Sequence, residues 1–158
     1  MQSFDARRAW SSVPPAERRV LELAWDACAA GTIGVGAVVL SEQGEIISAA
    51  RNATRGRPAP DQLLSGTYMA HAEINALGRI PTERSLRACT LLTTLLPCMM
   101  CAGAAVMAHV GRIRYLADDP LFPSGFAPER MDEFVDSQWP HYEAYEEGEW
   151  SALALLLS

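Results

Sequence analysis

The residues of this chain best suited to chemistry are a histidine and a glutamate two positions apart, followed downstream by two cysteines three positions apart. They are His71 and Glu73, then Cys98 and Cys101. Imidazole nitrogen and thiolate sulfur are ligands that zinc prefers, and three of them leave one position of a tetrahedral ion for water. This is the arrangement of a catalytic zinc site, and Glu73 is the acid/base that such a water needs.

Each of these residues also has an ordinary explanation. A Cys-x-x-Cys pair can be redox active or simply buried, and a surface histidine or glutamate needs no function. A closed structural zinc site requires a fourth protein ligand, for which the remaining thiols are Cys28 and Cys89. Neither cysteine has a nearby partner in sequence, and both are better explained as core residues. We therefore favour an open site that holds one Zn²⁺ ion per chain.

Helical and extended patterns alternate around these residues. We expect helices from residues 14–17 to near 30, from 71 to near 78, from 98 to near 110, from 131 to near 137 and from 149 to near 157. We expect strands over residues 34–40, 46–50, 88–94 and 112–117. His71 and Cys98 both fall at helix starts, where unsatisfied N–H groups and a partial positive charge stabilise thiolates. This order of elements suggests a three-layer α/β sandwich around a mixed sheet.

Length and composition favour one domain outside the membrane. A chain of 158 residues fits a single core, and no apolar run approaches the ~20 residues that cross a bilayer. The N-terminal segment carries Asp5, Arg7 and Arg8 and lacks the apolar stretch of a signal peptide. We expect a soluble cytoplasmic protein with no membrane partner.

The charge distribution argues against a nucleic-acid partner. The net charge is −6, and residues 129–158 alone carry eight acidic side chains against Arg130, a net charge of −7. Proteins that grip a phosphate backbone usually show a basic stripe that supplies much of the affinity. The acidic segment would repel such a backbone, so we expect a small-molecule substrate.

Taken together, the motifs resemble the cytidine deaminase-like superfamily, in the branch of tRNA adenosine deaminases, guanine deaminases and fungal cytosine deaminase. The resemblance runs from Gly34 to Phe122. It rests on Gly-Val-Gly-Ala-Val-Val from Gly34, Arg51-Asn52, His-Ala-Glu-Ile-Asn-Ala-Leu from His71, and Thr-Thr-Leu-Leu-Pro-Cys-Met-Met-Cys from Thr93. H-x-E…P-C-x-x-C is the signature of zinc deaminases that act on nucleobases. The resemblance implies an α/β fold, a three-layer α/β/α sandwich around a mixed five-stranded sheet, in one domain spanning residues 1–158.

The resemblance also implies roles for individual residues. His71, Cys98 and Cys101 are zinc ligands, and Glu73 is the proton shuttle. Substrate contacts are implied for Asn52 at a polar edge of the ring, the N–H of Ala72, the carbonyl of Leu96 and the ring of Phe122, which stacks on the base. Asn52 as a turn residue and Phe122 as loop packing are the ordinary alternatives. Relatives commonly form homodimers, and the small-residue helix over Ala102–Ala108 is compatible with such an interface.

One position departs from the pattern of the branch. The tRNA and guanine enzymes typically have glutamate directly before the Pro-Cys pair, where this chain has Leu96, and the Thr-Thr-Leu-x-Pro-Cys run is closer to fungal cytosine deaminase. We expect a hydrolytic deaminase that removes the exocyclic amine of a small free nucleobase or nucleoside of cytosine or guanine type. The alternatives are a tRNA adenosine (A-to-I) deaminase and an inactive, zinc-stabilised interaction domain.

Overall fold

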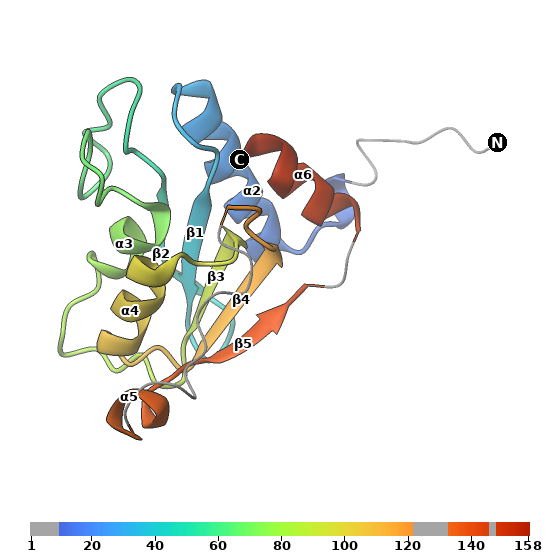
Figure 1. The fold of residues 1–158 in the computed structure, drawn as a ribbon. Coiled ribbons are helices and arrows are strands. Elements are labelled where there is room, and N and C mark those ends of the chain that lie inside the picture. Colours follow the sequence, from blue (N-terminus) through green and yellow to red (C-terminus); the bar gives the residue numbers. More distant parts are fainter. Residues whose placement is uncertain (1–9, 122–132, 146–147) are drawn as a thin grey trace.

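A five-stranded sheet separates two layers of helices in the computed structural model, which describes residues 10–121, 133–145 and 148–158 (Figure 1). The helices are α2 (Pro15–Ala29), α3 (Ala72–Leu77), α4 (Met99–Met107), α5 (Glu133–Ser137) and α6 (Glu149–Leu157). The strands are β1 (Gly36–Leu40), β2 (Ile46–Arg51), β3 (Thr90–Leu95), β4 (Arg112–Ala117) and β5 (His141–Ala144). Helices α2 and α6 lie on one face of the sheet, and α3 and α4 lie on the other (Figure 1).

The sheet is mixed, as the resemblance implies. Its strand order is β2-β1-β3-β4-β5, in which β1 is antiparallel to both neighbours and β3, β4 and β5 run parallel. The expected α/β fold with a mixed five-stranded sheet is therefore confirmed. In the part of the chain that the structure describes, no helix combines the length and apolar character needed to cross a bilayer.

The fifth strand is the element that the sequence pattern does not locate. β5 is a short edge strand whose residues are half-buried or exposed, so it lacks an apolar signature. Its Glu143 carboxylate instead bonds the guanidinium groups of Arg112, at 3.1 Å, and Arg114, at 3.6 Å, on β4. Part of the acidic C-terminal segment is thus neutralised by arginines of the neighbouring strand.

The helix expected to reach residue 110 is α4, which ends earlier, at Met107. Two residues further on, His109 has a φ of 56°, which is not a helical conformation.

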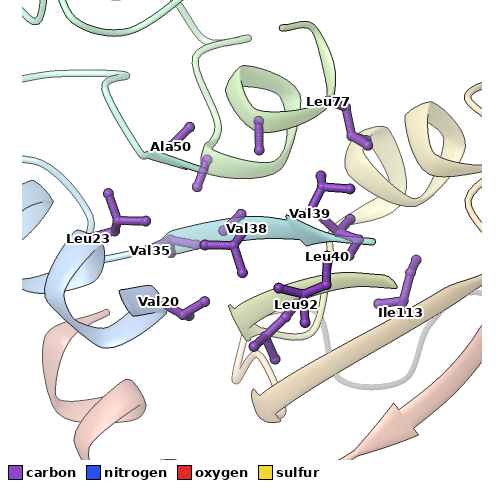
Figure 2. Packing of buried hydrophobic residues seen from close by; sticks show 14 of the residues in the cluster. Val20, Leu23, Val35, Val38, Val39, Leu40, Ala50, Leu77, Leu92 and Ile113 are labelled. Atoms are coloured by element: carbon purple, nitrogen blue, oxygen red, sulfur yellow. The ribbon is translucent and has the colours of Figure 1, made fainter. Parts of the chain in front are cut away.

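The core is densest around β1, whose five residues are all buried because helices cover both faces of the strand. Figure 2 shows β1 between Val20 of α2 on one side and Leu77 of α3 on the other. Gly36 permits the close approach of α2, since a Cβ there would collide with the carbonyl oxygen of Val20. The expected strand and helix of this region therefore pack without space for a larger residue.

The topology collects the chemistry-bearing segments at one end of the sheet. β1 begins where its antiparallel neighbours β2 and β3 end, and β4 ends beside β3 because the two are parallel. The segments that follow β2, β3 and β4 begin with Asn52, Leu96 and Asp118. In α/β sheets, ligands bind at such ends of the parallel strands. The candidate site lies there.

Candidate active site and metal centre

His71, Cys98 and Cys101 converge on one point, although 27 residues separate His71 from Cys98. Their ligand atoms all lie within 4.8 Å of one another. The Nδ1 atom of His71 is 3.7 Å from Sγ of Cys98 and 3.5 Å from Sγ of Cys101. His71 and Cys98 are the residues that cap α3 and α4, so the two helix starts face the same point.

This geometry fits a tetrahedral zinc ion. Bond lengths of about 2.3 Å to sulfur and 2.0–2.1 Å to nitrogen place N and S about 3.6 Å apart around such an ion. Both observed N···S distances agree with that separation. The donor set of one imidazole and two thiols is also one that zinc prefers. His71, Cys98 and Cys101 are therefore the residues that would hold the ion.

The other two cysteines do not complete a closed site. Among the described residues, the cluster able to hold a metal consists of His71, Cys98 and Cys101 alone. Cys28 is exposed near the end of α2, and Cys89 is buried with its thiol 3.9 Å from the carbonyl oxygen of Ser85. The alternative of a structural site with Cys28 or Cys89 as fourth ligand is not supported.

Glu73 lies beside the ligand cluster in a buried position. It occupies the first turn of α3 and is only 4% exposed. One carboxylate oxygen is 3.4 Å from Sγ of Cys101, and the other accepts a hydrogen bond of 3.4 Å from the Thr93 hydroxyl. Burial raises the pKa of Glu73, because a charged carboxylate loses hydration inside the protein. A carboxyl group with a raised pKa is suited to accept and return protons near neutral pH.

The thiols and the imidazole alter one another's pKa values. A hydrogen bond from Cys101 lowers the pKa of Cys98 to about 4, and the same bond, together with burial, raises the pKa of Cys101. A hydrogen bond with Cys98 raises the pKa of His71. A zinc ion at this point favours the thiolate of both cysteines, because coordinating thiols lose their protons.

Asn52, a buried residue that directly follows β2, is held in one orientation. Its Oδ1 atom accepts hydrogen bonds from the backbone N–H of Thr54, at 3.0 Å, and from the Thr54 and Thr32 hydroxyls, both at 2.9 Å. A backbone N–H can only donate, so the atom facing it must be the amide oxygen. The NH₂ group of Asn52 is thereby left to donate to a ligand.

A cavity of about 380 Å³ joins these groups. It is lined by residues of the sheet end and of the segments after β3 and β4, with Ser158 beside them: Ile33, Val35, Asn52, His71, Glu73, Leu95, Leu96, Cys98, Asp119, Pro120, Leu121 and Ser158. Its size falls within the range of small-molecule sites. The cavity brings the catalytic candidate, two metal ligands, Asn52 and Leu96 together.

Two further substrate contacts are predicted from the sequence, the N–H of Ala72 and the ring of Phe122. The Ala72 side chain is buried in the core, while its N–H belongs to the first turn of α3, where helix geometry leaves it without a partner within the helix. Phe122 lies outside the described residues.

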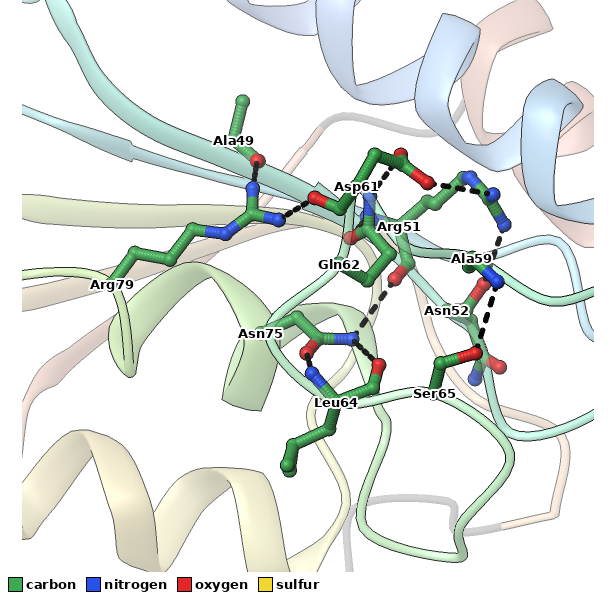
Figure 3. Close-up of polar contacts among 10 residues, drawn as sticks. All are labelled: Ala49, Arg51, Asn52, Ala59, Asp61, Gln62, Leu64, Ser65, Asn75 and Arg79. Carbon is green, nitrogen blue, oxygen red and sulfur yellow. Dashed lines mark hydrogen bonds and ion pairs between the residues drawn. The ribbon is translucent and has the colours of Figure 1, made fainter.

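Three residues of the site are absent from the sequence-based set. Thr93 supports Glu73 from β3, and Asp119 adds a second carboxylate to the cavity wall. Asn75, one turn along α3 from His71, bonds both the N–H of Leu64, at 2.6 Å, and its carbonyl, at 3.1 Å (Figure 3). It thereby anchors the long loop between β2 and α3. The Thr-Thr and His-x-Glu-x-Asn patterns contain two of these residues, but nothing in them reveals the contacts.

Comparison with known proteins identifies the family. Residues 16–117 match the family described as the cytidine and deoxycytidylate deaminase zinc-binding region. This segment covers more than half of the chain and includes all three metal ligands and Glu73. The chain belongs to this zinc-binding deaminase family.

Relatives within the family differ in what their names describe. The chain is 36% identical over 128 residues to a tRNA-specific adenosine deaminase of Haemophilus influenzae, covering 78% of this chain and 68% of that protein. It is 38% identical over 127 residues to a tRNA(Ile)-lysidine synthase of Deinococcus deserti, covering 78% of this chain. The chain spans 22% of the length of that synthase.

Among solved structures, the chain resembles a guanine deaminase from Nitrosomonas europaea. The TM-score is 0.63 at 26% identity, and the match covers 92% of this chain and 84% of that one. The arrangement of sheet and helices is therefore shared over most of both chains.

Proposed function

We propose that this chain is a hydrolytic deaminase that removes the exocyclic amine of a small free nucleobase or nucleoside of cytosine or guanine type. The observation that carries the proposal is the buried Glu73 carboxylate next to the three-ligand cluster, both opening into a cavity of about 380 Å³. An acid/base, a three-ligand metal site and a cavity of this size are the parts that the reaction requires.

In the overall reaction, water adds to the ring carbon that carries the amine, the C–N bond breaks, and ammonia leaves as a carbonyl forms. The chemistry that zinc supplies in such a site is Lewis acidity, which lowers the pKa of a bound water to about 7. Glu73 accepts the proton of the attacking water and delivers it to the ring nitrogen. It then carries the second proton to the departing amine, so that one carboxyl group serves both transfers.

Groups around the cavity orient the substrate. Asn52 donates from its NH₂ group to an acceptor on the ring, since its oxygen is already engaged by Thr32 and Thr54. The Leu96 carbonyl accepts from the leaving amine, and the Ala72 N–H contacts the ring. The stacking role of Phe122, the homodimer and the cytoplasmic location stay predictions.

A tRNA adenosine deaminase is the second candidate, and the relatives favour it. Both the Haemophilus and the Deinococcus proteins are named for reactions on tRNA. Against it stand the net charge of −6 and the apolar Leu96 in place of a glutamate. Substrate size therefore separates the two candidates.

Ammonia release from a defined panel tests the proposal. The zinc-loaded protein is offered cytosine, cytidine, guanine, guanosine and adenosine, alongside a tRNA anticodon stem-loop. We expect release from at least one small substrate, and Glu73→Gln should reduce kcat about 10²–10⁴-fold or more. Release from the stem-loop alone would move the assignment to the tRNA reaction. An unchanged rate in Glu73→Gln, with zinc removal unfolding the protein, would favour the inactive interaction domain.

A further inference from the structure

Helix α6 ends at the wall of the catalytic cavity. Leu157 is its last residue, and Ser158, which follows, lines the cavity. The Ser158 hydroxyl donates to the carbonyl of Leu155 at 2.8 Å, so Ser158 is held against the last turn of the helix. The helix is tied to the sheet in turn, because the Ser151 hydroxyl donates to the carbonyl of Leu116 on β4. Part of the cavity wall therefore belongs to a helix on the face of the sheet opposite α3 and α4.

A backbone hydrogen bond joins the end of α6 to the segment that leads into β1. The N–H of Gly34 donates to the carbonyl of Leu157 at 3.0 Å. Gly34 is buried, and a Cβ there would collide with the same carbonyl, so this close approach requires glycine. Ile33 and Val35, on either side of Gly34, both line the catalytic cavity. The contact with α6 thus determines where this part of the cavity wall lies.

The same segment holds Asn52 at two points. The N–H of Asn52 donates to the carbonyl of Val35 at 2.8 Å, and the Thr32 hydroxyl donates to Oδ1 of Asn52 at 2.9 Å. Residues 32–35 therefore fix both the backbone and the side chain of Asn52. Because Gly34 lies between these two contacts in the chain, a shift of the segment away from α6 would move Asn52 with it.

We propose that the end of α6 sets the position of Asn52 through residues 32–35, which makes Gly34 and Thr32 positioning residues for substrate binding. Neither residue is among those that line the catalytic cavity. The inference rests on the proposed function, in which Asn52 orients the ring. A binding residue that is held in place before the ligand arrives gives higher affinity, because less freedom is lost on binding. Loss of the contact should therefore weaken substrate binding and leave the chemical step intact.

Gly34→Ala disrupts the contact with Leu157, and Gly111→Ala is its matched control. A Cβ at Gly111 would collide with the carbonyl of Arg87 in the same way, but Gly111 directly precedes β4 and so lies at the end of the sheet away from the site. We expect Gly34→Ala to raise KM about tenfold with kcat nearly unchanged, the effect of one lost hydrogen bond. Gly111→Ala should lower stability without changing KM. The substrate is whichever member of the panel releases ammonia, the stem-loop included.

Thr32→Val tests the same inference if the alanine variant does not fold. It removes the hydroxyl that bonds Asn52 without adding bulk, so KM should again rise about tenfold, and Thr32→Ser should restore most of the affinity. Amide exchange followed by NMR is a readout that needs no turnover. The N–H of Asn52 should exchange about tenfold faster in Gly34→Ala and Thr32→Val than in the wild-type protein or Gly111→Ala, because its bond to Val35 opens more often.

The positioning role would be overturned by an unchanged KM in both Gly34→Ala and Thr32→Val, by a fall in kcat alone, or by unchanged exchange of the Asn52 N–H. An equal rise in KM in Gly111→Ala would also overturn it, since a general loss of stability would then explain the effect. Failure of the wild-type protein to release ammonia from any substrate would refute the proposed function, while the exchange rates would still decide whether α6 holds Asn52 in place.

Discussion

Thr93 transfers no proton itself, but its hydroxyl positions the carboxylate of Glu73, which does. Its side chain is fully buried, and its hydroxyl lies 3.4 Å from a Glu73 oxygen and 3.2 Å from the carbonyl of Gly36. The hydroxyl has a single proton to share between these acceptors. It therefore fixes the carboxylate against β1 while leaving the second Glu73 oxygen on the side of Cys101.

We predict that Thr93→Val, which keeps the shape but removes the hydroxyl, lowers kcat about tenfold with little change in KM. The reason is that a hydrogen bond to a charged group is lost at the proton-transferring residue and not at the substrate. Thr93→Ser should restore most of the rate. Steady-state kinetics with whichever small substrate of the panel releases ammonia would measure this. Thr94→Val is the control, because that hydroxyl accepts from the Gly36 N–H instead. A change in KM alone, or no rescue by serine, would contradict the positioning role.

For individual residues, the sequence predicts the metal ligands and Glu73 but not the residues that hold neighbouring groups in place. His71, Glu73, Cys98 and Cys101 are recognisable because residue type and spacing together encode metal chemistry. Thr93 and Asn75 have no such signature, since their function depends on which backbone groups the fold places beside them.

The elements position the site by close packing of β1 against α2. We predict that Gly36→Ala lowers the free energy of unfolding by about 1–3 kcal/mol, because the added methyl group collides with the Val20 carbonyl. The matched substitution is Gly103→Ala in α4, where a Cβ meets nothing within 4 Å. It should raise the free energy of unfolding by up to about 1 kcal/mol, as alanine is the better helix former. Urea denaturation measures both, and equal stabilities of the two variants would argue against the packing described.

Strong periodic or apolar segments could be located from the sequence, and β4 and α6 have the expected bounds. β5 could not, because it is held by ion pairs between Glu143 and the β4 arginines and not by an apolar face. The fixed orientation of Asn52 is equally hidden. It depends on a hydrogen bond from Thr32, in the segment after α2, which no local pattern encodes.

Over the whole molecule, the outward face of α4 remains without a covering element among the described residues. Met99 and Met107 are 65% and 75% exposed. They lie four residues before and four residues after Gly103, so they share one apolar face of α4. Contiguous apolar surface of this kind is typical of protein–protein contacts. We predict a homodimer through α4, with a mass in light scattering twice that of the 17.2 kDa chain.

Met107→Glu should shift this mass to that of a single chain, since a buried unpaired carboxylate in the interface is costly. The zinc content and the circular dichroism spectrum serve as controls for folding. A wild-type protein that scatters as a monomer at micromolar concentration would exclude the predicted dimer.

The coordination shell of the bound metal tests the account most directly. X-ray absorption at the zinc edge of the purified protein should report one ion per chain, bound by two sulfurs at about 2.3 Å and two lighter atoms, one from imidazole and one from solvent. Replacement of Glu73 by glutamine should leave this shell unchanged, because the carboxylate is not a ligand. A shell with three or four sulfurs, or protein without zinc, would contradict the open site from which the proposed chemistry follows.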